Sequence, residues 1–120
     1  MTRVAVLCSG RGSNLQALID AQAQGALGPA RIELVIANVP TAPALERARR
    51  AGIPAESRPS RGFTREEYDS QLLLLLRGHR IGLLCLAGYM RLLSPTFMQE
   101  VGTPVLNVHP ALLPLSLIHI

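Results

Sequence analysis

Short apolar segments alternate with amphipathic segments along nearly the whole chain, and this alternation limits the possible folds more than any other feature. The apolar segments are rich in Val, Ile and Leu and end at Gly, Pro or Asn, which is typical of strands buried on both faces. We expect strands at residues 3–9, 31–38, 55–58, 81–88 and 104–109. Because strands joined through helices form parallel sheets with right-handed crossovers, the sequence predicts an α/β fold: a doubly wound, mainly parallel sheet with helices on both faces.

The first two intervening segments carry the start and stop signals of helices. SNLQALIDAQAQG places Leu15, Leu18, Ile19 and Ala23 on one helical face and has Gly25 as a plausible stop. PALERARRAG has a proline suited to the first helical turn and a glycine just past the expected end. Both segments therefore fit crossover helices between parallel strands.

Two further helices are indicated by their N-terminal caps. Thr64 is followed three residues later by Glu67, which is the spacing of a capping box. Ser94 precedes Pro95, so that Ser94 can cap a short helix whose first position is proline. We expect these helices to complete the alternation before the last strand.

Composition limits the class of protein and of partner. At 120 residues, 48% of them apolar and 17% charged, the chain fits one soluble globular domain. All 12 basic residues are arginines, and the net charge of +4 suits anionic ligands but is too small and too scattered to indicate nucleic acid. With 3% aromatic residues and no Trp, the chain also has little for base stacking.

The two cysteines and the N-terminus indicate the compartment. Cys8 and Cys85 lie in the apolar runs VAVLC and GLLCLAG, which favours two buried, reduced thiols over the alternatives, a disulfide or a metal-binding pair. The apolar run after Arg3 is too short for a signal peptide or a membrane span. We therefore expect a cytoplasmic protein.

A glycine-rich loop, CSGRGSN, follows the first strand and opens the first helix, at the sheet edge where doubly wound proteins bind ligands. Gly10 and Gly12 permit a sharp turn, and the amides of Gly12, Ser13 and Asn14 would then point outward at the positive end of a helix dipole. The loop lacks the third glycine of a dinucleotide fingerprint and the lysine of a P-loop. It indicates a phosphate site, with a simple turn capped by Ser13 as the alternative.

Two arginines and an apolar group follow the third and fourth strands. Arg65 and Arg91 are placed to bind a carboxylate in a two-point manner, although a solvated surface position is the alternative for each. Met90, Leu92 and Leu93 could form an apolar wall for a flat ring, or belong to the ordinary core.

Asn107 and His109 lie two residues apart in the last expected strand, so both side chains point to the same face. An amide can donate to an oxygen that gains negative charge, and an imidazole can donate or accept a proton. Pro110 is expected to end the strand directly after His109, which places Asn107 and His109 at the carboxyl edge of the sheet. His79 fits a surface turn. No carboxylate accompanies the pair in the sequence pattern, and no His, Cys and carboxylate cluster has the spacing of metal ligands.

Taken together, these segments resemble the phosphoribosylglycinamide formyltransferase family, which implies an incomplete Rossmann-like formyltransferase fold. The resemblance runs in order from Val4 to Pro114, through VLCSGRGSNLQALIDA, ANVPTAPALERARRAGIP, FTREEYDSQL, LAGYMRLLSPTF and LNVHPALLP. The glycine-Ser-Asn loop separates this family from the methionyl-tRNA formyltransferases and formyltetrahydrofolate hydrolases, which share the Asn-x-His-Pro segment. The resemblance implies formyl transfer from 10-formyltetrahydrofolate to the amine of glycinamide ribonucleotide, in de novo purine biosynthesis.

The family pattern also implies a role for each candidate residue. It implies that Gly12, Ser13 and Asn14 bind the substrate phosphate and that Asn107 and His109 are the catalytic pair. It implies that the folate contacts Arg65, Met90, Arg91, Leu92, Leu93 and Asn107. The amine attacks the formyl carbon directly, and the pair stabilises the oxyanion of the tetrahedral intermediate. No metal and no covalent enzyme intermediate are implied.

The sequence departs from the family pattern after Pro114. Family members continue with a proline-glycine loop, further strands and a catalytic aspartate, whereas this chain ends in LSLIHI. We therefore expect residues 1–114 to be the N-terminal nucleotide-binding part of a formyltransferase. Residues 115–120, including His119, are expected to be a non-family tail, with an artefact of the sequence as one explanation of its origin. Activity of the chain is expected to be impaired.

Two alternatives to the transferase are considered. One is a non-catalytic phosphate- or nucleotide-binding half-domain. The other is the nucleotide-binding part of an oxidoreductase, which is disfavoured by the missing third glycine and by Asn38, which stands where such proteins have an acidic residue.

Overall fold

The computed structural model describes residues 2–8, 10–39, 41–59, 61–89 and 93–108. These residues form a five-stranded parallel sheet in the order β3-β2-β1-β4-β5. The strands are β1 (Thr2–Cys8), β2 (Ala30–Ala37), β3 (Ala55–Ser57), β4 (Leu83–Ala87) and β5 (Val105–Asn107). The helices are α1 (Ser13–Ala23), α2 (Pro43–Arg50), α3 (Arg65–Gly78) and α4 (Pro95–Glu100).

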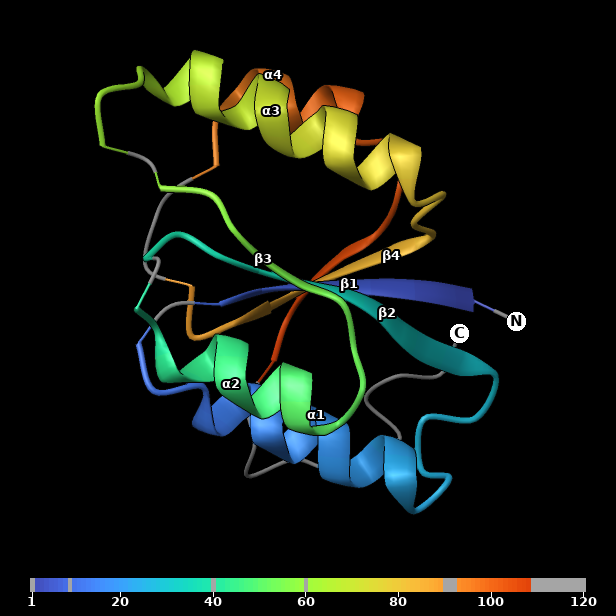
Figure 1. Ribbon diagram of the computed structural model, residues 1–120. Coiled ribbons are helices and arrows are strands. Elements are labelled where there is room, and N and C mark those ends of the chain that lie inside the picture. The colour runs from blue at the N-terminus through green and yellow to red at the C-terminus, as the bar shows by residue number, and fades with distance from the viewer. Residues whose placement is uncertain (1, 9, 40, 60, 90–92, 109–120) are drawn as a thin grey trace.

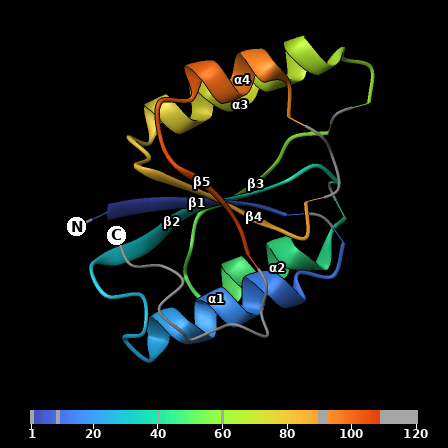
Figure 2. The same cartoon turned by 180° about the vertical axis from the view of Figure 1, so that it is seen from behind.

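The helices form two layers, one on each face of the sheet. Helices α1 and α2 lie side by side on one face, and α3 and α4 lie on the other (Figures 1 and 2). The doubly wound α/β architecture predicted from the strand and helix alternation is thereby confirmed.

Strand β1 is the centre of the fold because it pairs with both β2 and β4. All five residues from Val4 to Cys8 are buried. Alternate side chains of the strand enter opposite layers, as the two-residue period of a strand requires. Val4, Val6 and Cys8 join the core beneath α1 and α2, whereas Ala5 and Leu7 join the core beneath α3 and α4.

The apolar face of α1 differs from the prediction at one position. Leu15, Leu18 and Ile19 are buried as expected, but Ala23 is exposed and Ala21 is buried in its place. Ala21 lies three residues after Leu18 and joins the same core as Leu18 and Leu27. Ala23 is the last residue of the helix, where the chain turns and the amide of Ala26 donates to the carbonyl of Ala21 at 2.8 Å.

The predicted caps of the later helices are present. The hydroxyl of Thr64 accepts from the amide of Glu67 at 3.1 Å, and the Glu67 carboxylate accepts from the amide of Thr64 at 2.8 Å, which completes the capping box of α3. The hydroxyl of Ser94 accepts from the amide of Phe97 at 3.1 Å and caps α4. Local sequence signals therefore fixed both helix starts.

The carboxyl ends of the five strands lie at a single edge of the sheet. The register pairs Cys8 with both Ala37 and Ala87, pairs Ala37 with Ser57, and pairs Leu86 with Asn107. The loops that follow these residues consequently share one edge, which is where doubly wound proteins bind ligands.

Both cysteines are buried and free, as predicted. Burial raises the pKa of each thiol to about 12, because the interior disfavours the charged thiolate. Within the described part of the chain, no helix is long and apolar enough to span a membrane.

Candidate functional site

The glycine loop turns directly from β1 into α1. Gly10 and Gly12 have φ angles of +67° and +81°, in the left-handed region that glycine adopts without strain. Gly12 is the N-cap of α1, and its carbonyl accepts the first helical hydrogen bond, from the amide of Gln16 at 2.8 Å. The alternative in which Ser13 caps the helix is wrong, since Ser13 is already the first helical residue and Gly12 is the N-cap.

Among the described residues, no side chain caps the first amides of helix α1. Ser13 is exposed and Asn14 is half-buried, so the start of the helix reaches the surface at the ligand edge of the sheet. Amides at such a position, with the positive end of the helix dipole, can bind the oxygens of an anion. The arrangement is suited to a phosphate group.

Gly12 also permits a close approach between α1 and α2. A Cβ atom on Gly12 would lie 2.7 Å from both the Cα and the Cβ of Ala44, a distance at which atoms collide. A glycine is thus required at position 12 for two reasons: the positive φ angle of the backbone and the close packing of α2 against it.

Arg47 of α2 forms hydrogen bonds with the glycine loop and with α1. Its Nε donates to the carbonyl of Arg11 at 2.8 Å, and its Nη1 donates to Oε1 of Gln16 at 3.3 Å. Gln16 in turn donates to Asp20 at 2.9 Å. One side chain therefore joins the loop before α1 to the first turns of that helix.

The loop after β4 lies against the glycine loop. A Cβ atom on Gly88 would lie 3.6 Å from Nδ2 of Asn14, so the Asn14 amide group reaches the carboxyl end of the neighbouring strand. The site thereby includes residues that are about 75 positions apart in the sequence but belong to adjacent parallel strands.

Asn107 lies at the end of β5, paired with Leu86 of β4, and its side chain is exposed. Val108 is only 5% exposed, and its amide donates to the carbonyl of Leu86 at 2.9 Å. The predicted alternation, with Asn107 outward and Val108 inward, is present. Since β4 alone separates β1 from β5, the glycine loop and Asn107 are about two strand spacings, or roughly 10 Å, apart.

The remaining candidates divide into two groups. Arg65 is exposed at the first position of α3, and Leu93 is half-buried against the core beneath α3 and α4. Arg65 begins the helix that follows β3, and Leu93 lies in the loop that follows β4, so both are at the ligand edge. His109, Met90, Arg91 and Leu92 lie outside the described residues.

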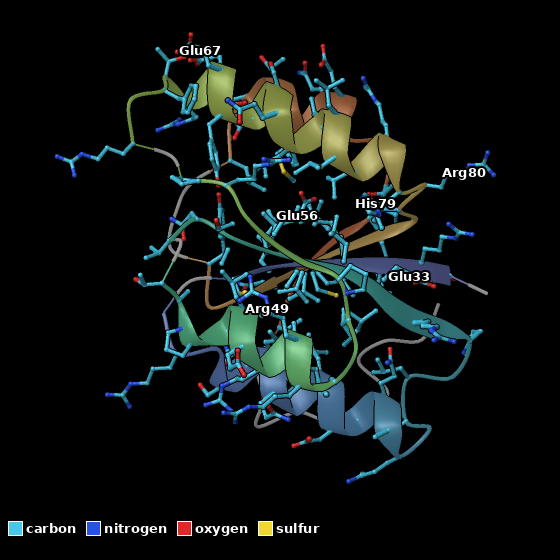
Figure 3. The ribbon with its side chains drawn as sticks, viewed as in Figure 1. Glu33, Arg49, Glu56, Glu67, His79 and Arg80 are labelled. Carbon is cyan, nitrogen blue, oxygen red and sulfur yellow. The ribbon has the colours of Figure 1, made fainter. Side chains whose placement is uncertain are left out.

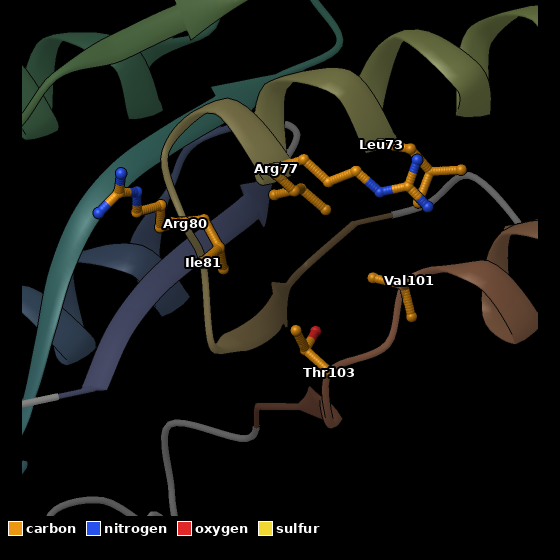
Figure 4. Close-up of a pocket in the computed structure, with 7 residues that line it drawn as sticks. Leu73, Arg77, Arg80, Ile81, Val101 and Thr103 are labelled. Carbon is orange, nitrogen blue, oxygen red and sulfur yellow. The ribbon is translucent and has the colours of Figure 1, made fainter.

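His79 and Arg80 lie at the other end of the molecule. They follow α3 and precede β4, so they occupy the amino edge of the sheet (Figure 3). A cavity of about 290 Å³ opens there, lined by Leu73, Leu76, Arg77, Arg80, Ile81, Val101 and Thr103. The side chains of Arg77 and Arg80 extend away from one another (Figure 4), so they do not converge on one ligand group.

The sequence did not indicate several residues that support the ligand edge. Ala44 and Arg47 are ordinary members of an amphipathic helix, and only the fold shows that they contact the glycine loop. Asn38, at the end of β2, has a buried Oδ1 that accepts no hydrogen bond from the described residues. Within the described ranges, no group of three or more His, Cys, Asp or Glu side chains could hold a metal ion.

Comparisons with known proteins agree with this architecture. The profile of the formyl transferase family matches residues 2–115. The trifunctional purine biosynthetic protein adenosine-3 of Drosophila melanogaster is 50% identical over 114 residues, which are 93% of this chain and 8% of that protein. The phosphoribosylglycinamide formyltransferase of Haemophilus influenzae is 42% identical over 115 residues, which are 95% of this chain and 54% of that enzyme.

Solved structures give the same result. The chain is similar to glycinamide ribonucleotide transformylase 1 of Geobacillus kaustophilus, with a TM-score of 0.84 and 40% identity over 96% of this chain and 61% of that one. The corresponding protein of Symbiobacterium toebii gives a TM-score of 0.82 and 39% identity, over 91% and 51% of the two chains.

The fold first defines the class, a Rossmann-like α/β protein with its loops gathered at the carboxyl edge of a parallel sheet. Within that class, the chain belongs to the formyl transferase family. The family resemblance noted in the sequence is thus confirmed. The chain spans about half the length of the Haemophilus influenzae relative, and less than a tenth of the Drosophila melanogaster one.

Proposed function

We propose that this chain supplies the N-terminal part of a folate-dependent enzyme that formylates glycinamide ribonucleotide in the cytoplasm, during de novo purine biosynthesis. The formyl donor is 10-formyltetrahydrofolate, which is consumed as a co-substrate. The observation that carries the proposal is the glycine loop that opens α1 at the ligand edge of a formyl transferase fold, together with the names of the relatives.

The phosphate of the substrate would bind at the start of α1. Gly12, Ser13 and Asn14 present backbone amides there, and Ser13 and Asn14 add short polar side chains. No side chain of the described residues caps this helix start. Asn14 reaches Gly88 at the end of β4, and the rest of the substrate would extend across that strand. The reacting amine would then approach β5, roughly 10 Å from the glycine loop by the spacing of parallel strands.

The chemistry would take place beside Asn107 and His109. The substrate amine attacks the formyl carbon and forms a tetrahedral intermediate whose oxygen carries negative charge. Asn107 donates to this oxyanion through its amide, and protonated His109 donates a second hydrogen bond. A proton then reaches the departing folate nitrogen, and tetrahydrofolate leaves. The exposed end of β5, where Asn107 lies, is consistent with access by both substrates.

The folate would occupy the loops that follow β3 and β4. Arg65 would bind its carboxylate in a two-point contact, while Met90, Arg91, Leu92, Leu93 and Asn107 would line the pocket for its ring. Arg65 at the start of α3 and Leu93 in the loop after β4 both lie at the ligand edge, which supports this assignment.

We also propose that residues 1–114 form the functional N-terminal part and that residues 115–120 are a non-family tail. The second candidate function is a phosphate- or nucleotide-binding half-domain without turnover. It requires only the glycine loop, where Gly10 and Gly12 turn the chain into the start of α1.

The test compares binding with turnover. We expect calorimetric titration of the chain with glycinamide ribonucleotide to show binding that requires the phosphate, so that the dephosphorylated compound binds at least tenfold more weakly, roughly the contribution of one or two charge-assisted hydrogen bonds. Ser13→Asp, which puts a carboxylate at the phosphate site, should abolish binding, whereas Ser70→Asp on the exposed surface of α3 should not. Equal affinity for both compounds would refute the phosphate site.

Formyl transfer is measured separately, from the release of tetrahydrofolate. Turnover that is lost in His109→Ala while substrate binding persists would support the transferase. Phosphate-dependent binding without turnover would support the half-domain.

A further inference from the structure

Apart from Tyr68 and the two cysteines, Asp69 and Ser94 are the only polar or charged residues that are buried among the described residues, and they contact one another. Each is 2% exposed. Oδ2 of Asp69 accepts a hydrogen bond from the backbone amide of Ser94 at 2.8 Å. The pair joins α3 to the residue that begins α4, across 25 positions of the sequence.

Ser94 is a junction between a loop and a helix. Its hydroxyl accepts from the amide of Phe97 at 3.1 Å, and its carbonyl accepts from the amide of Met98 at 3.1 Å. Its own amide would be an unpaired donor at a helix start if Asp69 were absent. Asp69 therefore fixes the position at which the loop after β4 ends.

The neighbouring residue of α3 reaches the other loop. The hydroxyl of Tyr68, which is fully buried, donates a hydrogen bond to the carbonyl of Arg58 at the end of β3. The first turns of α3 thus contact the loop that leads to Arg65 and the loop that ends at Leu93. These two loops carry most of the folate contacts proposed above.

Burying a carboxylate costs free energy. Removing it from water disfavours folding unless hydrogen bonds replace its hydration, and Oδ1 of Asp69 has no partner among the described residues. Asp69 also lines a small cavity of about 50 Å³ between α3 and α4, together with Ser94 and Phe97. An apolar residue would fill this space more favourably if packing were the only requirement.

We propose that Asp69 is a positioning residue for the formyl donor, because it holds the Ser94 end of the loop that lines the folate pocket. This inference rests on the proposed function. It predicts that loss of Asp69 weakens folate binding and leaves the phosphate site unaffected, since the glycine loop is held by α2 on the opposite face of the sheet.

Two variants of Asp69 distinguish a positioning role in folate binding from a general effect on the stability of the protein. Asp69→Ala removes the acceptor for the Ser94 amide, whereas Asp69→Asn keeps a carbonyl oxygen that can accept the same hydrogen bond. Ser70→Ala is the matched control on the same helix, because the Ser70 hydroxyl donates within α3, to the carbonyl of Glu66 at 2.9 Å, and bonds to no other described residue. Melting curves of all three variants establish that each is folded at the temperature of the assay.

The first measurement is amide hydrogen exchange, which needs no ligand. Asp69→Ala should accelerate exchange at Ser94 and Phe97 at least tenfold, the order expected for one lost buried hydrogen bond, and leave Gln16 unchanged. Asp69→Asn and Ser70→Ala should exchange like the unaltered chain. Unchanged exchange at Ser94 in Asp69→Ala would overturn the proposal.

The second measurement is calorimetric binding of 10-formyltetrahydrofolate and of glycinamide ribonucleotide, each alone. Asp69→Ala should lower the affinity for folate about tenfold and the affinity for the ribonucleotide less than twofold. In Asp69→Asn, the affinity for folate should return to that of the unaltered chain. Equal losses for both ligands, or no loss for folate despite faster exchange at Ser94, would overturn the positioning role. An unaltered chain that binds no folate would instead refute the proposed folate site, and the exchange result would still decide whether Asp69 holds Ser94.

Discussion

Gly12 and Ala44 are packed so closely that a Cβ atom on Gly12 would lie 2.7 Å from two carbon atoms of Ala44. The contact joins the start of α1 to the first turn of α2, and it fixes the path of the glycine loop between them. Since Gly12 also has a φ of +81°, any larger residue must move the backbone as well as the neighbouring helix.

Gly12→Ala should therefore lower the free energy of unfolding by about 2–4 kcal/mol, the sum of a left-handed backbone penalty and an overpacked contact. Gly10→Ala is the matched control, because Gly10 also has a positive φ but no atom lies within 4 Å of its added Cβ. It should lose only about 1–2 kcal/mol. Urea unfolding of both variants measures the difference, and equal losses would contradict the role of Ala44.

Arg47→Ala should loosen the glycine loop, because two hydrogen bonds to Arg11 and Gln16 are lost. We expect stability to fall by about 1 kcal/mol and affinity for glycinamide ribonucleotide to fall about fivefold, measured by denaturation and calorimetry. Arg49→Ala removes the same charge from an exposed position of the same helix (Figure 3) and should change neither quantity appreciably. A similar loss of affinity in both variants would indicate a general charge effect instead.

Arg80→Gly should stabilise the protein. Arg80 has a φ of +55° at the end of α3, where the amide of Ile81 donates to the carbonyl of Leu76 at 3.0 Å, and glycine is favoured at such a position. The expected gain is about 1 kcal/mol, or a rise in Tm of roughly 3–5 °C by calorimetry. Arg80→Ala loses the same side chain but keeps the Cβ, so a gain of equal size in that variant would contradict the backbone explanation.

The buried thiols predict a loss of stability at high pH. Burial raises the pKa of Cys8 and Cys85 from 9.0 to about 12, so the unfolded chain releases these protons before the folded protein does. Their contribution is fully present below about pH 9 and is lost as pH rises toward 12. Between pH 9 and 10 we expect a loss of about 1 kcal/mol per thiol, measured by urea unfolding.

Cys8→Ala provides the control for this pH dependence. One of two titrating thiols is then absent, so the loss that the thiols cause between pH 9 and 10 should be halved. A dependence as steep as that of the unaltered chain would show that the buried thiols are not responsible.

Much of the fold was predictable because its signals are local. A few adjacent residues are enough to predict the buried strand from Val4 to Cys8. The same holds for the capping box of Thr64 and Glu67. The exposed Ala23 was predicted incorrectly, because its burial depends on the turn after α1 and not on helical spacing.

The candidate site was predictable only in part. The glycine loop and the outward Asn107 follow from strand ends and alternation, which the sequence displays. Arg47 and Asp69 were missed because their importance lies in contacts with residues 36 and 25 positions away. A single sequence has no pattern that distinguishes these two from other charged residues on amphipathic helices.

The placement of α1 with α2 on one face and α3 with α4 on the other has a consequence for how such a protein can change. The glycine loop depends on Ala44 and Arg47 in one layer, and the loop at Ser94 depends on Asp69 in the other. Under the proposed function, mutations that change the preference for one ligand would accumulate in one helical layer, while the loops for the other ligand keep their support. A search for a new acceptor would then best begin with a library confined to α1 and α2.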